Sequence, residues 1–219
     1  MTRRSTGVLV GISCMVVLLF ATAYRRPAPA AKDSRLSGRA RADQILVGRV
    51  LVLSHACGDC HGIAGNNPAA TGFLDGMRDT TLQQSRIGPY ATRPKNLTPD
   101  VATGIGSFTE RQIFNALRYG LRPEETPDVQ ITSMVPGQGN FPLHPHYLAP
   151  PMPWPSWRYM SDEELMAIAA YLKNGLKPVR NKVPDSEGPP DFWASAYTVE
   201  KIGPYPLAPY PTANEKATR

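Results

Sequence analysis

Two cysteines and a histidine stand together in Cys57-Gly58-Asp59-Cys60-His61, a C-x-x-C-H pattern. Two thiols at this spacing are able to add to the two vinyl groups of one haem, and the pattern is typical of c-type attachment. The histidine that follows is then held beneath the iron and supplies the proximal ligand. The motif therefore predicts one covalent haem c, bound through Cys57 and Cys60 and ligated by His61.

The surrounding sequence does not favour the other common uses of a cysteine pair. A thioredoxin-like redox pair would lie near a βαβ pattern, and no such pattern surrounds these cysteines. A zinc site would need a second pair of soft ligands at a finger-like spacing, which the sequence lacks. The third cysteine, Cys14, lies in an apolar run, so the cysteines do not make a disulfide framework either.

The second axial ligand has several candidates, of which we favour Met152. This residue lies in Pro150-Pro151-Met152-Pro153, where prolines stiffen the loop and reduce the entropy lost on fixing a ligand. Methionine ligation would raise the reduction potential, whereas His144 or His146 would give bis-histidine ligation and a lower one. Filling a gap in the core is the other role open to Met152. The remaining candidates are Met77, Met134, Met160, Met166 and His55.

A helix is expected to lead directly into the haem motif. Between residues 41 and 55, Leu46, Val50 and Leu53 fall at helical spacing, and Cys57 continues the series. We predict that this series forms one apolar seam, which delivers the chain to the haem.

Two further helices have clear start and stop signals. Thr109-Glu110-Arg111-Gln112 and Ser161-Asp162-Glu163-Glu164 match the capping-box pattern, and Gly120 and Gly175 follow as stops. The apolar positions of these helices fall on one face in each case: Ile113, Phe114 and Leu117 in the first, and Leu165, Ile168, Ala169 and Leu172 in the second.

Long irregular connections separate the helices. Residues 62–108 hold many Gly, Pro, Asn and Thr, and 17 of the 23 prolines follow Gly120. Because proline fixes φ and lacks an N–H, much of the second half must be loop, turn or extended chain. We find no convincing strand pattern, so the predicted fold is all-α: a small helical domain around one haem, with long Pro/Gly-rich loops.

The N-terminus carries an uncharged apolar segment at residues 7–24, which is near the lower length for a membrane-spanning helix. The same segment fits a signal peptide, because Ala21-Thr22-Ala23 matches a cleavage site. Arg25 and Arg26 directly after the apolar run disfavour cleavage, so we favour an N-terminal membrane helix. The predicted organisation is an anchor or signal segment at 1–26, a linker at 27–40, the haem domain at 41–176 and a proline-rich tail at 177–219.

The charge of the chain gives no footprint for nucleic acid. The net charge is +6, but Arg3, Arg4, Arg25 and Arg26 flank the apolar segment. Without these four arginines, 20 basic residues face 18 acidic ones, and no Lys/Arg run remains in the body.

The order of helix, C-x-x-C-H, loop, helix, methionine loop and capped last helix resembles the class I c-type cytochromes. More narrowly, residues 41–176 resemble the haem domains of cytochrome c subunits of membrane-bound alcohol, aldehyde and gluconate dehydrogenases. Beside the haem motif, the resemblance is carried by Asn96–Asp100, Thr103–Gly106, Leu117–Gly120 and Met152–Glu163.

The resemblance implies that Met152 is the distal ligand and that Asn96–Asp100 and Gly104–Gly106 lie along the haem edge. It points to Arg158 or Trp157 as a hydrogen-bond donor to a haem propionate. It also places the haem domain outside the cytoplasm, in the periplasm or on the outer face of the cytoplasmic membrane.

We therefore predict an electron-transfer protein rather than an enzyme. It would carry single electrons from a membrane-associated donor, such as a dehydrogenase, to a respiratory acceptor. A haem peroxidase or reductase with an exchangeable sixth ligand is the first alternative, and a membrane-tethered gas or redox sensor is another. A third is a non-catalytic subunit that docks through residues 121–148 and the tail. The partner stays open, because the related subunits commonly have three haem domains and a shorter stretch at 121–147.

Overall fold

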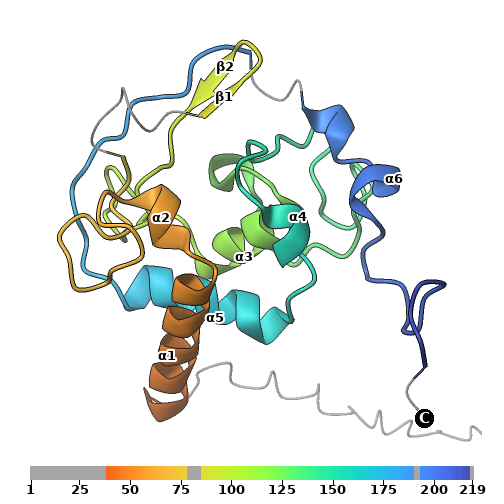
Figure 1. Cartoon of the computed structure of the whole chain (residues 1–219), viewed down its shortest axis with the longest axis horizontal. Coiled ribbons are helices and arrows are strands. Elements are labelled where there is room, and N and C mark those ends of the chain that lie inside the picture. The colour runs from red at the N-terminus through yellow and green to blue at the C-terminus, as the bar shows by residue number, and fades with distance from the viewer. Residues whose placement is uncertain (1–37, 78–84, 190–192, 218–219) are drawn as a thin grey trace, which may run out of the picture. The chain divides into compact units, whose positions relative to one another are not determined.

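The structure is a computed structural model that describes residues 38–77, 85–189 and 193–217. Regular structure in these ranges is mostly helical with little strand (Figure 1), which agrees with the predicted cytochrome c-like fold. Within them, no helix is both long enough and apolar enough to cross a membrane. The predicted anchor at 1–26 lies outside the described residues, as does most of the 27–40 linker.

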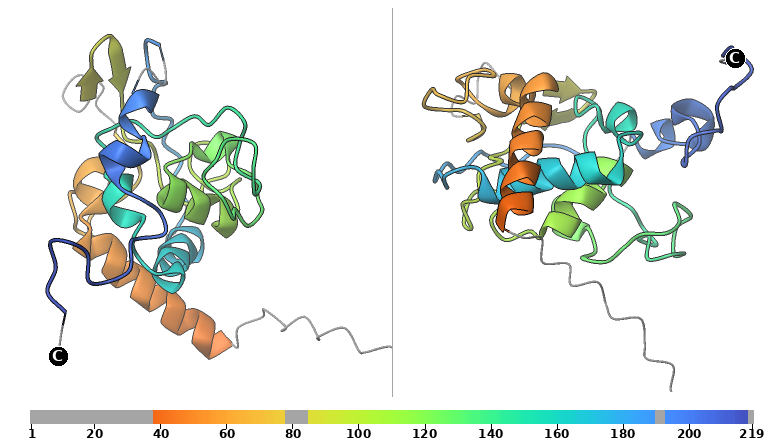
Figure 2. Two further views of the ribbon diagram at one scale, coloured as in Figure 1. Left: turned by 90° about the vertical axis from the view of Figure 1, so that its right-hand side faces the viewer. Right: turned by 90° about the horizontal axis from the view of Figure 1, so that it is seen from below.

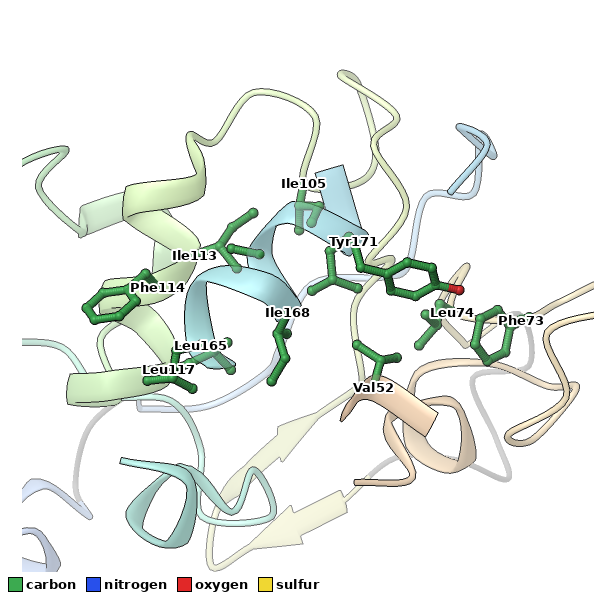
Figure 3. Close-up of a cluster of buried hydrophobic side chains, with 12 residues drawn as sticks. Val52, Phe73, Leu74, Ile105, Ile113, Phe114, Leu117, Leu165, Ile168 and Tyr171 are labelled. Atoms are coloured by element: carbon green, nitrogen blue, oxygen red, sulfur yellow. The ribbon is translucent and has the colours of Figure 1, made fainter. Parts of the chain in front are cut away.

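The core forms where α5 (Asp162–Asn174) packs against both α1 (Gly38–Ser54) and α3 (Glu110–Tyr119). Figure 2 shows α1 crossing α5, and Figure 3 shows the side chains of α3 and α1 meeting opposite sides of α5. The buried members include Ile113, Phe114 and Leu117 of α3, Leu165, Ile168 and Leu172 of α5, and Val52 of α1.

The crossing of α1 and α5 depends on Gly48. A Cβ atom at this position would lie 1.9 Å from the backbone oxygen of Ala167, so only a residue without a side chain allows the two helices to approach so closely. This contact decides which face of α1 is buried, and Gly48 and Val52 lie on that face.

The predicted apolar seam of α1 is therefore wrong for its first two members. Leu46 and Val50 are 60% and 62% exposed, whereas Leu53 is half-buried against the core. The spacing was helical, but α1 also carries apolar residues on its other side. The close approach of α1 to α5 at Gly48 determines which face of α1 is buried, and the longest apolar series does not.

Gly48→Ala should lower the free energy of unfolding by about 1–3 kcal/mol or more, because the new methyl group must push α1 away from α5. Urea unfolding followed by circular dichroism measures this change. Gly38→Ala is the matched control in the same helix, since a Cβ there would have nothing within 4 Å. Equal stabilities of the two variants would contradict the packing account.

Both predicted capping boxes are present. The side chain of Thr109 accepts a hydrogen bond from the N–H of Gln112 at 3.1 Å, and the N–H of Thr109 donates to Oε1 of Gln112 at 3.0 Å. Ser161 and Glu164 repeat this arrangement at the start of α5. Helix α3 ends at Gly120, where φ is 70°, a left-handed conformation that favours glycine.

The connection after the haem motif contains a strand pair that the sequence did not predict. Strands β1 (Ser85–Ile87) and β2 (Tyr90–Thr92) are antiparallel, and a turn at Gly88 joins them with a φ of 56°. Strands of three residues are too short to show an alternating pattern. Ala91 of β2 also exchanges two backbone hydrogen bonds of 2.8 Å with Glu187, so the chain after α5 extends this hairpin.

The proline-rich residues 121–160 and the tail pack on each other. Tyr119 at the end of α3 joins Leu121, Ile131 and Phe141 in a second buried cluster, against which Tyr205 of the tail packs. The short elements in these segments are η1 (Pro123–Glu125), α4 (Trp154–Trp157), η2 (Ala194–Ala196) and α6 (Val199–Ile202).

Candidate haem site

The haem motif forms the short helix α2 (Cys57–His61), which follows α1 after a sharp turn at Ala56, where φ is 53°. Cys57 is half-buried and Cys60 is exposed, and both are free thiols. Burial raises the pKa of the Cys57 thiol to about 11. A neutral thiol at this position does not suit a redox-active cysteine pair, whose nucleophile needs a lowered pKa.

The ring of His61 is oriented by a backbone carbonyl. Its Nδ1 lies 2.8 Å from the oxygen of Lys95, and because a carbonyl only accepts, Nδ1 must carry the proton. Nε2 is then left with its lone pair, which is the arrangement that a metal-ligating histidine needs. Desolvation of the ring lowers the pKa of His61 and so favours this neutral form.

The Lys95 carbonyl is held in place by the residue that follows it. The fully buried Asn96 donates from Nδ2 to the oxygen of Val179 at 2.8 Å. Its Oδ1 accepts from the backbone N–H and the hydroxyl of Thr98, at 2.9 and 2.8 Å. Asn96 therefore connects the loop that supports His61 to the chain beyond α5. The sequence did not indicate this role, because the supporting group is a backbone carbonyl, which every residue has.

Asn96→Ala should destabilise the fold by about 1–3 kcal/mol, because it leaves buried partners without their hydrogen bonds. It should also weaken the hold on the Lys95 carbonyl. Unfolding in urea, followed by circular dichroism, measures the loss. Asn214 is exposed, so Asn214→Ala is the control and should change stability by no more than about 0.5 kcal/mol. Equal effects of the two substitutions would refute the proposed support.

Met152 lies in a tight turn, in which its N–H donates to the oxygen of Ala149 at 2.9 Å. It is half-buried and packs against the same cluster as Cys57. Trp157 of α4 meets the ring of His55 edge-on, with 5.8 Å between ring centroids. The segment that carries Met152 thus contacts the junction of α1 and α2, and Figure 1 places α2 and α4 on the same side of the α1–α5 pair.

The rival side chains for the sixth position have other contacts. His144 and His146 are exposed, and Nδ1 of His146 contacts the carboxylate of Glu125. The sulfur of Met134 lies 3.1 Å from Nη2 of Arg158. Met77 is buried, and Met160 and Met166 pack against the core. Since Met152 packs against the same cluster as Met160 and Met166, packing does not distinguish these three methionines, and ligation by Met152 stays a prediction.

The guanidinium of Arg158 lies among three aromatic rings. Its guanidinium carbon lies 5.9, 5.4 and 5.3 Å from the ring centroids of Trp154, Tyr159 and Tyr205. Burial lowers its pKa. Within the described chain, its Nε and Nη1 are buried without a hydrogen-bond partner. Of the two side chains suggested for a propionate, Trp157 contacts His55, two residues before the haem motif, and a hydrogen bond to a propionate stays a prediction for both.

Two cavities open among the described residues, and Thr98 of the predicted haem edge lines the second of them. One of about 300 Å³ opens between α3, residues 130–134 and Tyr205, and one of about 500 Å³ opens between residues 68–75 and 175–179. Neither is lined by the predicted thiols, imidazole or Met152 thioether.

The donor groups fit a haem c. One short helix presents two free thiols and an imidazole whose tautomer is fixed for ligation, and a thioether lies in the neighbouring segment. Cys57 and Cys60 would hold the porphyrin through thioether bonds, and His61 would ligate the iron.

Comparison with known proteins agrees with this class of site. The chain is 31% identical over 151 residues to the gluconate 2-dehydrogenase cytochrome c subunit of Pantoea cypripedii, covering 68% of this chain and 27% of the relative. It is 29% identical to the cytochrome c subunit of the quinone alcohol dehydrogenase of Gluconobacter oxydans, over 68% and 26% of the two chains. The fructose dehydrogenase cytochrome subunit of Gluconobacter japonicus is 27% identical over 66% and 24%. No protein-family model matches the chain.

These relatives confirm the resemblance to cytochrome c subunits of dehydrogenases. They are named as cytochrome subunits, and the prediction of an electron-transfer subunit rather than an enzyme is confirmed at this level. The chain spans about a quarter of the length of the relatives that it matches.

Proposed function

We propose that this chain is a mono-haem c-type cytochrome that carries single electrons from a dehydrogenase to a respiratory acceptor. The observation that carries the proposal is the hydrogen bond of His61 to the Lys95 carbonyl, directly beside two free thiols. A neutral imidazole with one free nitrogen, next to thiols at C-x-x-C spacing, is the donor set of a covalently bound haem.

The haem supplies the one-electron chemistry, with iron alternating between Fe(II) and Fe(III). Cys57 and Cys60 keep it in a loop-rich domain from which a non-covalent cofactor could dissociate. His61 would ligate the iron through Nε2, because the Lys95 carbonyl keeps the proton on Nδ1. Met152 would be the second protein ligand and would raise the reduction potential.

The dehydrogenase as donor is supported by the names of the relatives, each a cytochrome subunit of such an enzyme. The apolar segment at residues 7–24 would anchor the chain, with the haem domain in the periplasm or on the outer face of the membrane.

Absorption spectra of the purified full-length protein test the ligation. The oxidised protein should have the weak near-red band of methionine-to-iron charge transfer, and the reduced protein should not bind carbon monoxide at neutral pH. Ready binding of carbon monoxide without that band would favour the alternative of a haem enzyme with an exchangeable sixth ligand.

Fractionation tests the location. The pigment should stay with membranes after an alkaline carbonate wash and should be accessible to protease in spheroplasts. Recovery of the full-length pigment in the cytoplasmic fraction would contradict this part of the proposal.

A further inference from the structure

Arg118 of α3 connects its helix to the segment that carries Met152. The side chain is buried, with 2% of its surface exposed. Its Nη1 donates to the backbone oxygens of Arg158 and Met160, the second at 2.7 Å. Its Nη2 donates to Oδ1 of Asp162 at 2.5 Å. One planar guanidinium thus holds the residues that connect α4 to α5.

The other side of the same segment is held by packing against the end of α3. Trp154 is completely buried, and a Cβ at Gly120 would lie 2.1 Å from its ring. The oxygen of Gly120 accepts the N–H of Leu148 at 2.6 Å, four residues before Met152. Arg118 and Gly120, at the end of α3, therefore hold the chain on both sides of Met152, at Leu148 before it and at Arg158 and Met160 after it.

We infer that Arg118 is a positioning residue for Met152 and keeps its sulfur in place for the iron. The inference rests on the proposed ligation by Met152 and adds the device that maintains it. A neutral thioether has little electrostatic attraction for iron, so retention of the ligand depends on how narrowly its loop is confined. Arg118 confines that loop through hydrogen bonds from its buried, charged guanidinium to the backbone oxygens of Arg158 and Met160, and a charged donor strengthens such bonds.

The test compares substitutions that remove different contacts of the same group. Arg118→Gln removes both the carbonyl contacts and the ion pair, whereas Asp162→Asn removes only the charge of the ion-pair partner. Arg41→Gln is the control. Arg41 of α1 pairs with Glu110 at the start of α3, at the opposite end of that helix from Arg118. Each full-length variant is measured by its near-red methionine band and by carbon monoxide titration of the reduced form, at a temperature where circular dichroism shows it folded.

Arg118→Gln should lose most of the methionine band, and its reduced form should bind carbon monoxide at neutral pH, which the reduced wild type should not do, because the contacts that confine the Met152 segment are gone. Asp162→Asn and Arg41→Gln should keep the band. If Arg118→Gln does not mature, Arg118→Lys takes its place, since an ammonium cannot span both carbonyls and the carboxylate as a guanidinium does.

A normal band in the folded Arg118 variant would overturn the inference. So would an equal loss of the band in Arg41→Gln, because the effect would then follow from general destabilisation. Absence of the band from the wild type would instead refute ligation by Met152, so the two failures are distinguishable.

Discussion

Cys57→Ser combined with Cys60→Ser should abolish covalent haem attachment. A serine hydroxyl does not replace the thiol in the addition to a vinyl group, so any haem that the variant retains should pass into acidified acetone. Each single variant should keep at most one thioether, and its pyridine haemochrome band should move to longer wavelength because one vinyl group stays free. Haem staining of denaturing gels gives a direct measurement.

Cys14→Ser is the control for this pair. Cys14 lies in the apolar N-terminal segment, outside the haem motif, so the substitution should leave the haem content unchanged. Haem that stays attached in the double variant, or that is lost in Cys14→Ser, would show that a different part of the chain binds the cofactor.

Met152→Leu should have the second largest effect. Leucine is of similar volume but offers no lone pair, so packing against the core is nearly kept while the ligand is lost. The near-red band should disappear, the reduced protein should bind carbon monoxide, and the reduction potential should fall by on the order of 0.1 V or more, within the roughly 0.8 V range that axial ligands span.

Met166→Leu provides the comparison, because Met166 lies in α5 and packs against the core. Its spectrum and potential should match the wild type. An unchanged potential in Met152→Leu would direct attention to Met134 or to the exposed histidines, and the same pair of measurements on Met134→Leu would then decide between them.

The parts of the fold that the sequence predicted well are those encoded by neighbouring residues. The capping boxes at Thr109 and Ser161 and the stop at Gly120 depend on side chains that bond within one turn of their own helix. Such signals are complete in a short stretch of sequence, and all three appear in the structure. The C-x-x-C-H motif is local in the same sense.

The parts that the sequence did not predict depend on distant contacts. The buried face of α1 was misassigned because the decisive partner is the backbone of Ala167, more than a hundred residues away from Gly48. The orientation of His61 depends on the carbonyl of Lys95, and that carbonyl depends on Asn96 and on the chain near Val179. Every residue has the same backbone groups, so the sequence does not indicate which of them bind one another. Only the structure shows these contacts.

The roles of residues 121–148 and of the tail also depend on contacts between residues far apart in the sequence. Tyr119 and Tyr205 come from α3 and from the tail, yet they meet with 6.0 Å between ring centroids, perpendicular to each other. Deleting residues 190–219 would therefore expose apolar surface as well as remove a docking element. A docking role for the tail is better tested by surface substitutions than by truncation.

The central claim is that Cys57, Cys60 and His61 hold one iron porphyrin. Whole-protein mass spectrometry of the full-length chain, matured in cells with a c-type cytochrome assembly system, tests it most directly. We expect the mass to exceed that of the polypeptide by one haem, and we expect the addition to survive denaturation and acidified acetone. A colourless protein with the bare polypeptide mass would contradict the account.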